Sequence, residues 1–136
     1  GGLSAKDVSA LGVSGLEVVE IQDVSDILQG TARGGHGCWF DLRRTVGKAT
    51  DRASLTVLVH PTGEAYFQAA TSKATAKTAI PGLGDTAFYL PPTTDSPAAS
   101  VIARRGPLVV ETRIGNSKLL GQNLLVALTG LALERA

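Results

Sequence analysis

The sequence predicts an α+β domain in which helices cover a mainly antiparallel sheet of about six strands, in two layers and in the order α-βββ-α-βββ-α. Three observations lead to this prediction. Several segments alternate apolar and polar residues, which is typical of strands with one buried face. Turns rich in proline and glycine separate these segments. An alanine-rich segment near the middle and a leucine-rich segment at the end have helical spacing, and these helices are expected to cover one face of the sheet.

Length and composition indicate one globular domain spanning residues 1–136. Hydrophobic residues make up 43% of the chain and charged residues 18%, which is typical of a chain that buries a core without metals or disulfides. The formal net charge of +1 supplies no long-range field for attracting nucleic acid. Residues 119–133, the most apolar stretch, are interrupted by polar residues and fall short of the ~20 residues that span a bilayer.

Methionine is absent even from the first position, so we expect that an upstream segment was removed and that residues 1–2 are a candidate cleavage scar. Cys38 is the only cysteine, which excludes an intrachain disulfide and a multi-cysteine metal site. Secretion is left open by this cysteine usage.

The first half of the chain reads as a helix and three strands. Ser4 is a candidate N-cap for a short helix that ends at Gly12. Residues 16–24 alternate as a strand, and a glycine-rich loop follows over residues 25–37. Two alternating segments between residues 38 and 60 then predict an antiparallel hairpin, which Pro61 ends.

The second half repeats this order. Residues 63–77 are rich in alanine and predict a helix, with Phe67 on its apolar side. Residues 86–90 predict a strand, and residues 99–115 predict a hairpin. The final helix is expected to follow a cap at Asn116 or Ser117 and to bury an apolar stripe, which consists of Leu120, Leu124, Ala127, Leu128 and Leu131.

The stretch "PGLGDTAFYLP" has the spacing G-x-G-x-x-A, which is the shorthand for a dinucleotide-binding turn. Such a turn needs a preceding strand and a following helix, whereas the residues after Asp85 alternate as a strand. We therefore interpret Pro81, Gly82, Gly84 and Asp85 as a structural corner. The glycines permit backbone angles that other residues avoid, and the Asp85 carboxylate can accept hydrogen bonds from nearby amides.

No motif predicts a catalytic centre, a metal site or a cofactor. His36, Cys38 and His60 are chemically competent metal ligands, but their spacing is not diagnostic, and we interpret them as surface imidazoles and a buried thiol. A catalytic cysteine–histidine pair meets the same objection, although only geometry can exclude it. The segment around Ser14 lacks the G-x-S-x-G spacing of a serine hydrolase.

Five residues are candidate ligand-binding groups. Trp39 and Tyr89 lie opposite the smaller apolar residues of their strands, so each can line an exposed groove or pack in the core. Arg43, Arg104 and Arg105 belong to two basic pairs, which can hold an anionic ligand if the fold brings them together and are otherwise solvated strand ends.

Several segments together resemble the small cell-envelope lipoproteins of actinobacteria grouped as DUF3558. They are "LSAKDVSALG", "CWF", "SLTVLVHP", "IPGLGDTAFYL" and "LLVALTGLALERA", and they span nearly the whole chain. The resemblance implies an exported protein held to the membrane only through a lipid on an upstream cysteine, with a sheet-and-helix domain similar to extracellular sensor domains of bacterial kinases. It implies no enzyme activity.

From these observations we expect a noncatalytic, extracytoplasmic domain that binds a small amphiphilic ligand or an envelope protein. Two alternatives stay open. One is a sensor or interaction module of a larger envelope protein, and the other is a small hydrolase or thiol enzyme that uses Cys38.

Overall fold

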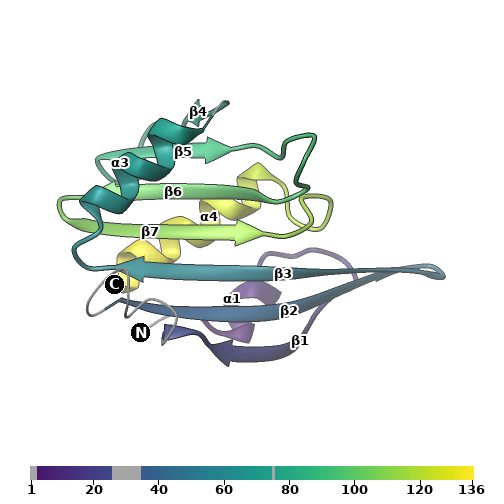
Figure 1. The fold of residues 1–136 in the computed structure, drawn as a ribbon. Helices are drawn as coiled ribbons and strands as arrows, with labels where there is room; N and C mark the ends of the chain where they lie inside the picture. Colours follow the sequence, from purple (N-terminus) through teal and green to yellow (C-terminus); the bar gives the residue numbers. More distant parts are fainter. Residues whose placement is uncertain (1–2, 26–34, 75) are drawn as a thin grey trace.

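The computed structural model describes residues 3–25, 35–74 and 76–136, and these form a seven-stranded antiparallel sheet with helices on both faces (Figure 1). The strands lie in the order β1-β2-β3-β7-β6-β5-β4. Their bounds are Leu16–Asp23 for β1, His36–Val46 for β2, Ala49–His60 for β3, Thr78–Ala79 for β4, Thr86–Leu90 for β5, Ala99–Arg105 for β6 and Leu108–Ile114 for β7. The prediction of an α+β fold is confirmed, with seven strands in place of about six.

The additional strand, β4, has two residues, Thr78 and Ala79, which pair with Tyr89 and Phe88 of β5. A segment this short shows no alternation in the sequence, so periodicity gives no signal for it. It forms because the corner over residues 81–85 turns the chain back antiparallel to its own preceding residues.

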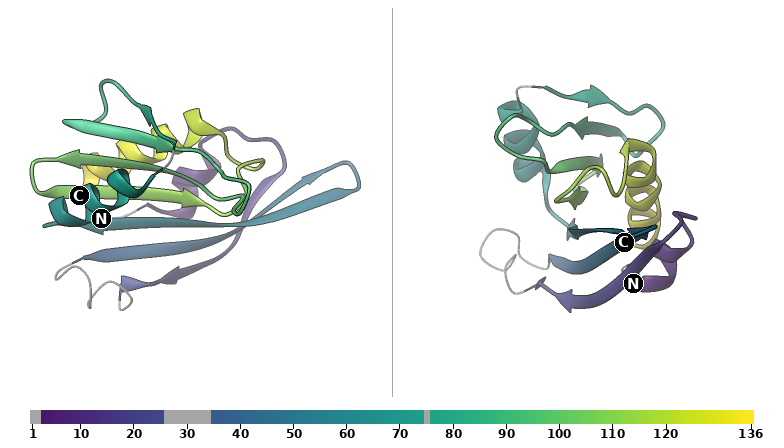
Figure 2. Two further views of the ribbon diagram at one scale, coloured as in Figure 1. Left: turned by 45° about the horizontal axis from the view of Figure 1, so that its top comes forward. Right: turned by 90° about the vertical axis from the view of Figure 1, so that its right-hand side faces the viewer.

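The helices are divided between the two faces of the sheet. Helix α4, Gln122–Arg135, and helix α1, Ala5–Ser9, lie on one face, and helix α3, Glu64–Lys73, lies on the other, as the right-hand view of Figure 2 shows. Two layers with one covered face were expected from the sequence, and α3 instead adds a partial third layer (Figure 2). The reason is that β6 and β7 carry apolar side chains on both faces, as buried central strands do.

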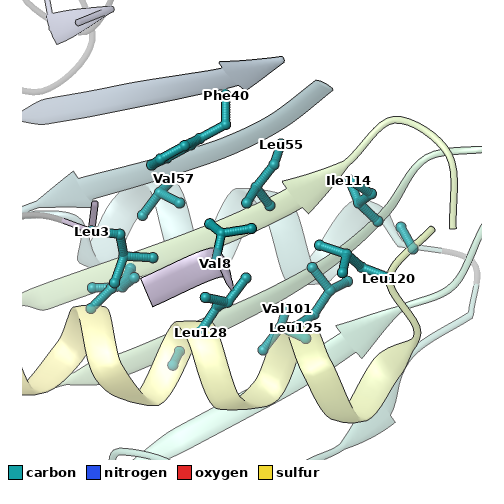
Figure 3. Packing of buried hydrophobic residues seen from close by; sticks show 14 of the residues in the cluster. Leu3, Val8, Phe40, Leu55, Val57, Val101, Ile114, Leu120, Leu125 and Leu128 are labelled. Atoms are coloured by element: carbon teal, nitrogen blue, oxygen red, sulfur yellow. The ribbon is translucent and has the colours of Figure 1, made fainter. Parts of the chain in front are cut away.

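The main core fills the space between the sheet and α4. Side chains of Phe40, Leu55 and Val101 from the strands meet Leu125 and Leu128 from α4, and all five are essentially buried (Figure 3). Helix α1 adds Val8 to the same cluster. No helix in the described ranges has the length and apolar character needed to cross a membrane.

An ion pair joins the two ends of the chain. Arg135 at the end of α4 lies 2.6 Å from Asp7 of α1, between Nη1 and Oδ2. The same carboxylate accepts a hydrogen bond from the backbone N–H of Ser4, at 2.7 Å, which stabilises the start of α1. Asp7 therefore ties the first helix to the last, and the Arg135 guanidinium lowers the pKa of its carboxyl.

Residues 81–85 form a turn that leads into β5. Gly82 and Gly84 both have positive φ, at 79° and 61°. The backbone N–H of Asp85 donates to the carbonyl oxygen of Arg104 at 2.7 Å, and its carboxylate accepts from the N–H of Gly106 at 2.8 Å. The glycines of the G-x-G-x-x-A stretch are thus followed by a strand, and their conformation joins that strand to the hairpin of β6 and β7.

Candidate functional site

Helix α3 organises the candidate site, because it crosses one face of β6 and β7 (Figure 1), and an opening lined by Ala70, Lys73 and Ala74 lies at its C-terminal end. Phe67 anchors it on a second, smaller apolar cluster with Ile102 and Val109. Its first turn comes close to the sheet at Gly63, where an added Cβ would lie 2.8 Å from the Cβ of Val109. Glycine at this position therefore sets how closely α3 approaches the strands.

The opening is a pocket of about 240 Å³ between the last turn of α3, the end of β5 and the segment 91–98. Its floor is a row of side chains that lie side by side on neighbouring strands. Leu90 of β5 is paired with Ser100 of β6, and Ser100 is paired with Arg113 of β7. Directly paired residues have Cβ atoms about 5 Å apart, so this row runs from an apolar group through a hydroxyl to a guanidinium.

The residues that form the walls of the pocket are small or basic. Ala70, Lys73 and Ala74 line it from α3, and Pro91 and Ala98 line it from the loop. Asp and Glu are absent from the described lining, so its only charged groups are the Lys73 ammonium and the Arg113 guanidinium. The pocket thus has an apolar side and a cationic side.

Three polar groups of the pocket are uncommitted, which here means that they make no hydrogen bond or ion pair with a residue that the structure describes. Lys73 and Arg113 make no hydrogen bond or ion pair with any residue that the structure describes. Ser100 is 5% exposed, and its hydroxyl likewise has no hydrogen-bond partner in the described ranges. Its oxygen is not among the fully buried atoms that lack a partner in the described ranges, so it can reach water or a ligand in the pocket.

A buried polar cluster lies beside the pocket, under the first turns of α3. The His60 ring stacks on the Tyr66 ring, with centroids 4.5 Å apart, and the Tyr66 hydroxyl donates to Oε1 of Glu111. His60 and Glu111 are only 1% and 6% exposed. Neither ring nitrogen of His60 has a hydrogen-bond partner in the described part of the chain.

Burial controls the titration of this cluster. It raises the pKa of the Glu111 carboxyl, although the Tyr66 hydroxyl and the nearby Arg113 charge act in the opposite direction. It lowers the pKa of His60, because removing the imidazole from water disfavours its charged form. The Tyr66 hydroxyl keeps its proton at any physiological pH, since burial and the Glu111 charge both raise its pKa.

The structure separates the two predicted aromatic binding residues. Trp39 is half-buried on β2, where it is paired with Thr56 and Gln22, on the face of the sheet that carries α3 farther along. Tyr89 lies on β5 and packs against the main core on the α4 side. The two rings are on opposite faces and do not line one groove.

The basic pairs are not brought together either. Arg43 lies on β2 and Arg104 on β6, with β3 and β7 between them. Arg43 forms an ion pair with Glu17 at 2.9 Å. Arg104 lies over the Phe67 ring, with its guanidinium carbon 5.9 Å from the ring centroid, and Arg105 donates to the carbonyl oxygen of Leu133 at 3.0 Å. Each of the three therefore has a partner within the chain.

His36, Cys38 and His60 do not form a metal site, and no group of three potential metal ligands occurs among the residues described. His36 is exposed and Cys38 is half-buried. The interpretation of His60 as a surface imidazole is wrong, because α3 folds over the end of β3 and buries the ring. Burial also raises the pKa of the Cys38 thiol, which makes it a weaker nucleophile at neutral pH.

Sequence reasoning missed the pocket residues Lys73, Ser100 and Arg113 and the buried Glu111. The available signal was the alternation of β7, which places Glu111 and Arg113 on one face and the apolar Val110 and Ile114 on the other. Comparisons with protein-family models, with curated protein sequences and with solved structures gave no match. The ligand-binding role of this chain is therefore inferred from its own geometry.

Proposed function

We propose that this chain is a noncatalytic binding domain whose ligand is a small amphiphile held in the pocket at the C-terminal end of α3. The pocket itself supports the proposal, because it places an apolar group, Leu90, and three uncommitted polar groups around one open space. Ligand sites commonly combine apolar walls with a few convergent polar groups. With about 240 Å³, the pocket lies below the usual range for drug-sized ligands, so its ligand is small.

A binding role is favoured over a catalytic role by the state of the titratable groups near the pocket. A general base must lie within hydrogen-bonding reach of the proton that it removes. His60 is buried under α3, and neither of its ring nitrogens makes a hydrogen bond to a nucleophile among the described residues. The Glu111 carboxyl group already accepts a hydrogen bond from the Tyr66 hydroxyl. The uncommitted groups, Lys73, Ser100 and Arg113, are suited to holding a ligand.

A matched pair of variants tests this proposal. Ala74→Trp fills the pocket from the end of α3, whereas Ala69→Trp places the same side chain on an exposed part of the same helix, outside the pocket. In a screen of small soluble compounds by ligand-observed NMR, hits should bind the wild type and Ala69→Trp but not Ala74→Trp. They should also be recovered unchanged after long incubation. Equal binding to all three proteins, or conversion of a hit to product, would contradict the proposal.

We also propose that the domain belongs to an exported, lipid-anchored protein of the cell envelope, on the strength of the DUF3558-like segments. The gene's upstream codons test this. A signal sequence ending in a lipobox cysteine is expected. A transmembrane helix joined to a kinase domain would favour the sensor alternative instead, and an upstream region with neither feature would overturn the envelope location.

A further inference from the structure

We propose that the pocket at the end of α3 selects ligands with an anionic headgroup, a carboxylate or a phosphate, joined to a short apolar part. This inference rests on the binding function proposed above and specifies the ligand's chemistry. The two cations that line the pocket come from different elements, Lys73 from α3 and Arg113 from β7, so the fold brings together charges that are 40 positions apart in sequence.

The orientation of the ligand follows from the floor of the pocket. The row Leu90, Ser100 and Arg113 is fixed by strand pairing, so the apolar end and the cationic end cannot exchange places. An anionic head therefore lies at Arg113, in the pocket that Lys73 also lines, and the apolar part lies toward Leu90. The unpartnered Ser100 hydroxyl, between the two ends, can donate to the headgroup.

Local charges that oppose an anion are offset. The C-terminal end of α3 carries a partial negative charge, but the Lys77 ammonium donates to the carbonyl oxygen of Thr71 at 3.2 Å in that last turn. Glu111, on the same face of β7 as Arg113, is the nearest carboxyl along that strand, and burial raises its pKa, which disfavours its negative form. It also forms no ion pair with Arg113, so the guanidinium is free to meet a ligand.

Arg113 and Lys73 are both exposed, so their attraction for an anion is screened by salt. A guanidinium holds a carboxylate or phosphate through two parallel hydrogen bonds, whereas an ammonium acts as a point charge. We therefore expect Arg113 to contribute more to affinity than Lys73. For a ligand of this size, affinity in the millimolar range is expected.

The test compares probes that share one tail and differ in the head. Hexanoate and hexyl phosphate should bind the wild-type chain at least about fivefold more tightly than 1-hexanol or hexylammonium, as measured by NMR titration of backbone amides. Arg113→Gln should weaken hexanoate binding about fivefold to tenfold and leave 1-hexanol unchanged. Lys48→Gln removes one positive charge at the distant β2–β3 turn and should have no effect (Figure 1).

The outcomes separate this inference from the broader function. If 1-hexanol or hexylammonium binds in the pocket as tightly as hexanoate, or if Arg113→Gln leaves hexanoate binding unchanged, the anion preference is wrong and the binding domain stands. If none of the four probes and no compound of the wider screen binds, both proposals fail. A preference between hexanoate and hexyl phosphate identifies the headgroup, and either preference agrees with the inference.

Discussion

Replacing Gly84 by alanine tests the reason for the corner before β5, and Gly82→Ala is its matched control. Both glycines have positive φ, which costs a residue with a Cβ about 1–2 kcal/mol. Only Gly84 lies against another part of the backbone. An added Cβ there would be 2.6 Å from the carbonyl oxygen of Arg104, whereas a Cβ at Gly82 meets nothing within 4 Å.

The expected difference between the two variants follows from this contact. A backbone oxygen at 2.6 Å must move, and overpacking of this kind typically costs a further 1–3 kcal/mol. The shift also strains the hydrogen bond from Asp85 N–H to the same oxygen, which contributes about 1 kcal/mol. Gly84→Ala should therefore lower the free energy of unfolding by about 3–5 kcal/mol and Gly82→Ala by about 1–2 kcal/mol.

Urea denaturation of the wild type and both variants, followed by far-UV circular dichroism, measures these losses. With a slope of about 2 kcal/mol per molar urea, the midpoints of the two variants should differ by about 1 M or more. If the two variants lose the same free energy of unfolding, the close approach of Gly84 to the Arg104 carbonyl oxygen of β6 is refuted.

Two further predictions concern the buried cluster beside the pocket. Glu111→Gln should stabilise the chain at neutral pH. Because burial raises the folded-state pKa of this carboxyl, the wild type loses stability as pH rises from about 4.3 through that pKa. Thermal melts of the variant over the same pH range should not show this loss. If the stability of the variant falls with pH as much as that of the wild type, the raised pKa of Glu111 is contradicted. His60→Phe keeps the stack on Tyr66 and removes two unpartnered nitrogens. Because burial lowers the folded-state pKa of His60, the wild type should lose stability as pH falls below about 6.5. The variant should lack this loss and should be about 1 kcal/mol more stable than the wild type at pH 7. A destabilised variant whose stability still falls with pH as in the wild type would show that water reaches the His60 ring.

Most strands were predictable because their alternation is local, and the departures have identifiable causes. In β1, a bulge between Val18 and Glu20 shifts the register, so Ile21 rather than Glu20 follows Val18 on the α4 side of the sheet. Strict alternation over residues 16–24 would place Val18 and Glu20 on the same face. A bulge depends on pairing with β2 and leaves no mark in the sequence of β1 alone.

The apolar stripe of α4 was predicted one position away from the buried one. Ala127 was expected inside and is exposed, whereas Leu125 and Thr129 are buried. Thr129 is one of the polar residues that interrupt the apolar stretch 119–133, but its hydroxyl donates to the carbonyl oxygen of Leu125 at 2.7 Å and lies 2.6 Å from the Thr112 hydroxyl. These hydrogen bonds allow a threonine to face the core, and only the position of β7 reveals them.

The candidate site was the least predictable part of the chain for the same reason. Lys73 and Arg113 come to line one pocket only after α3 crosses β7, and the floor of the pocket requires the pairing of β5, β6 and β7. Trp39 and the basic pairs stood out in the sequence because of their residue types. The pocket residues stand out only through their positions in the fold.

The most direct test of the central claim is a map of where a ligand binds. The ¹⁵N-labelled chain should be titrated with the tightest compound of the screen, and the amide shifts of its residues should be followed. The account predicts that the largest shifts fall at Ala70, Lys73, Ser100 and Arg113, around the pocket. Shifts concentrated instead on β1 and β2 around Trp39 would place the binding surface elsewhere and contradict the account.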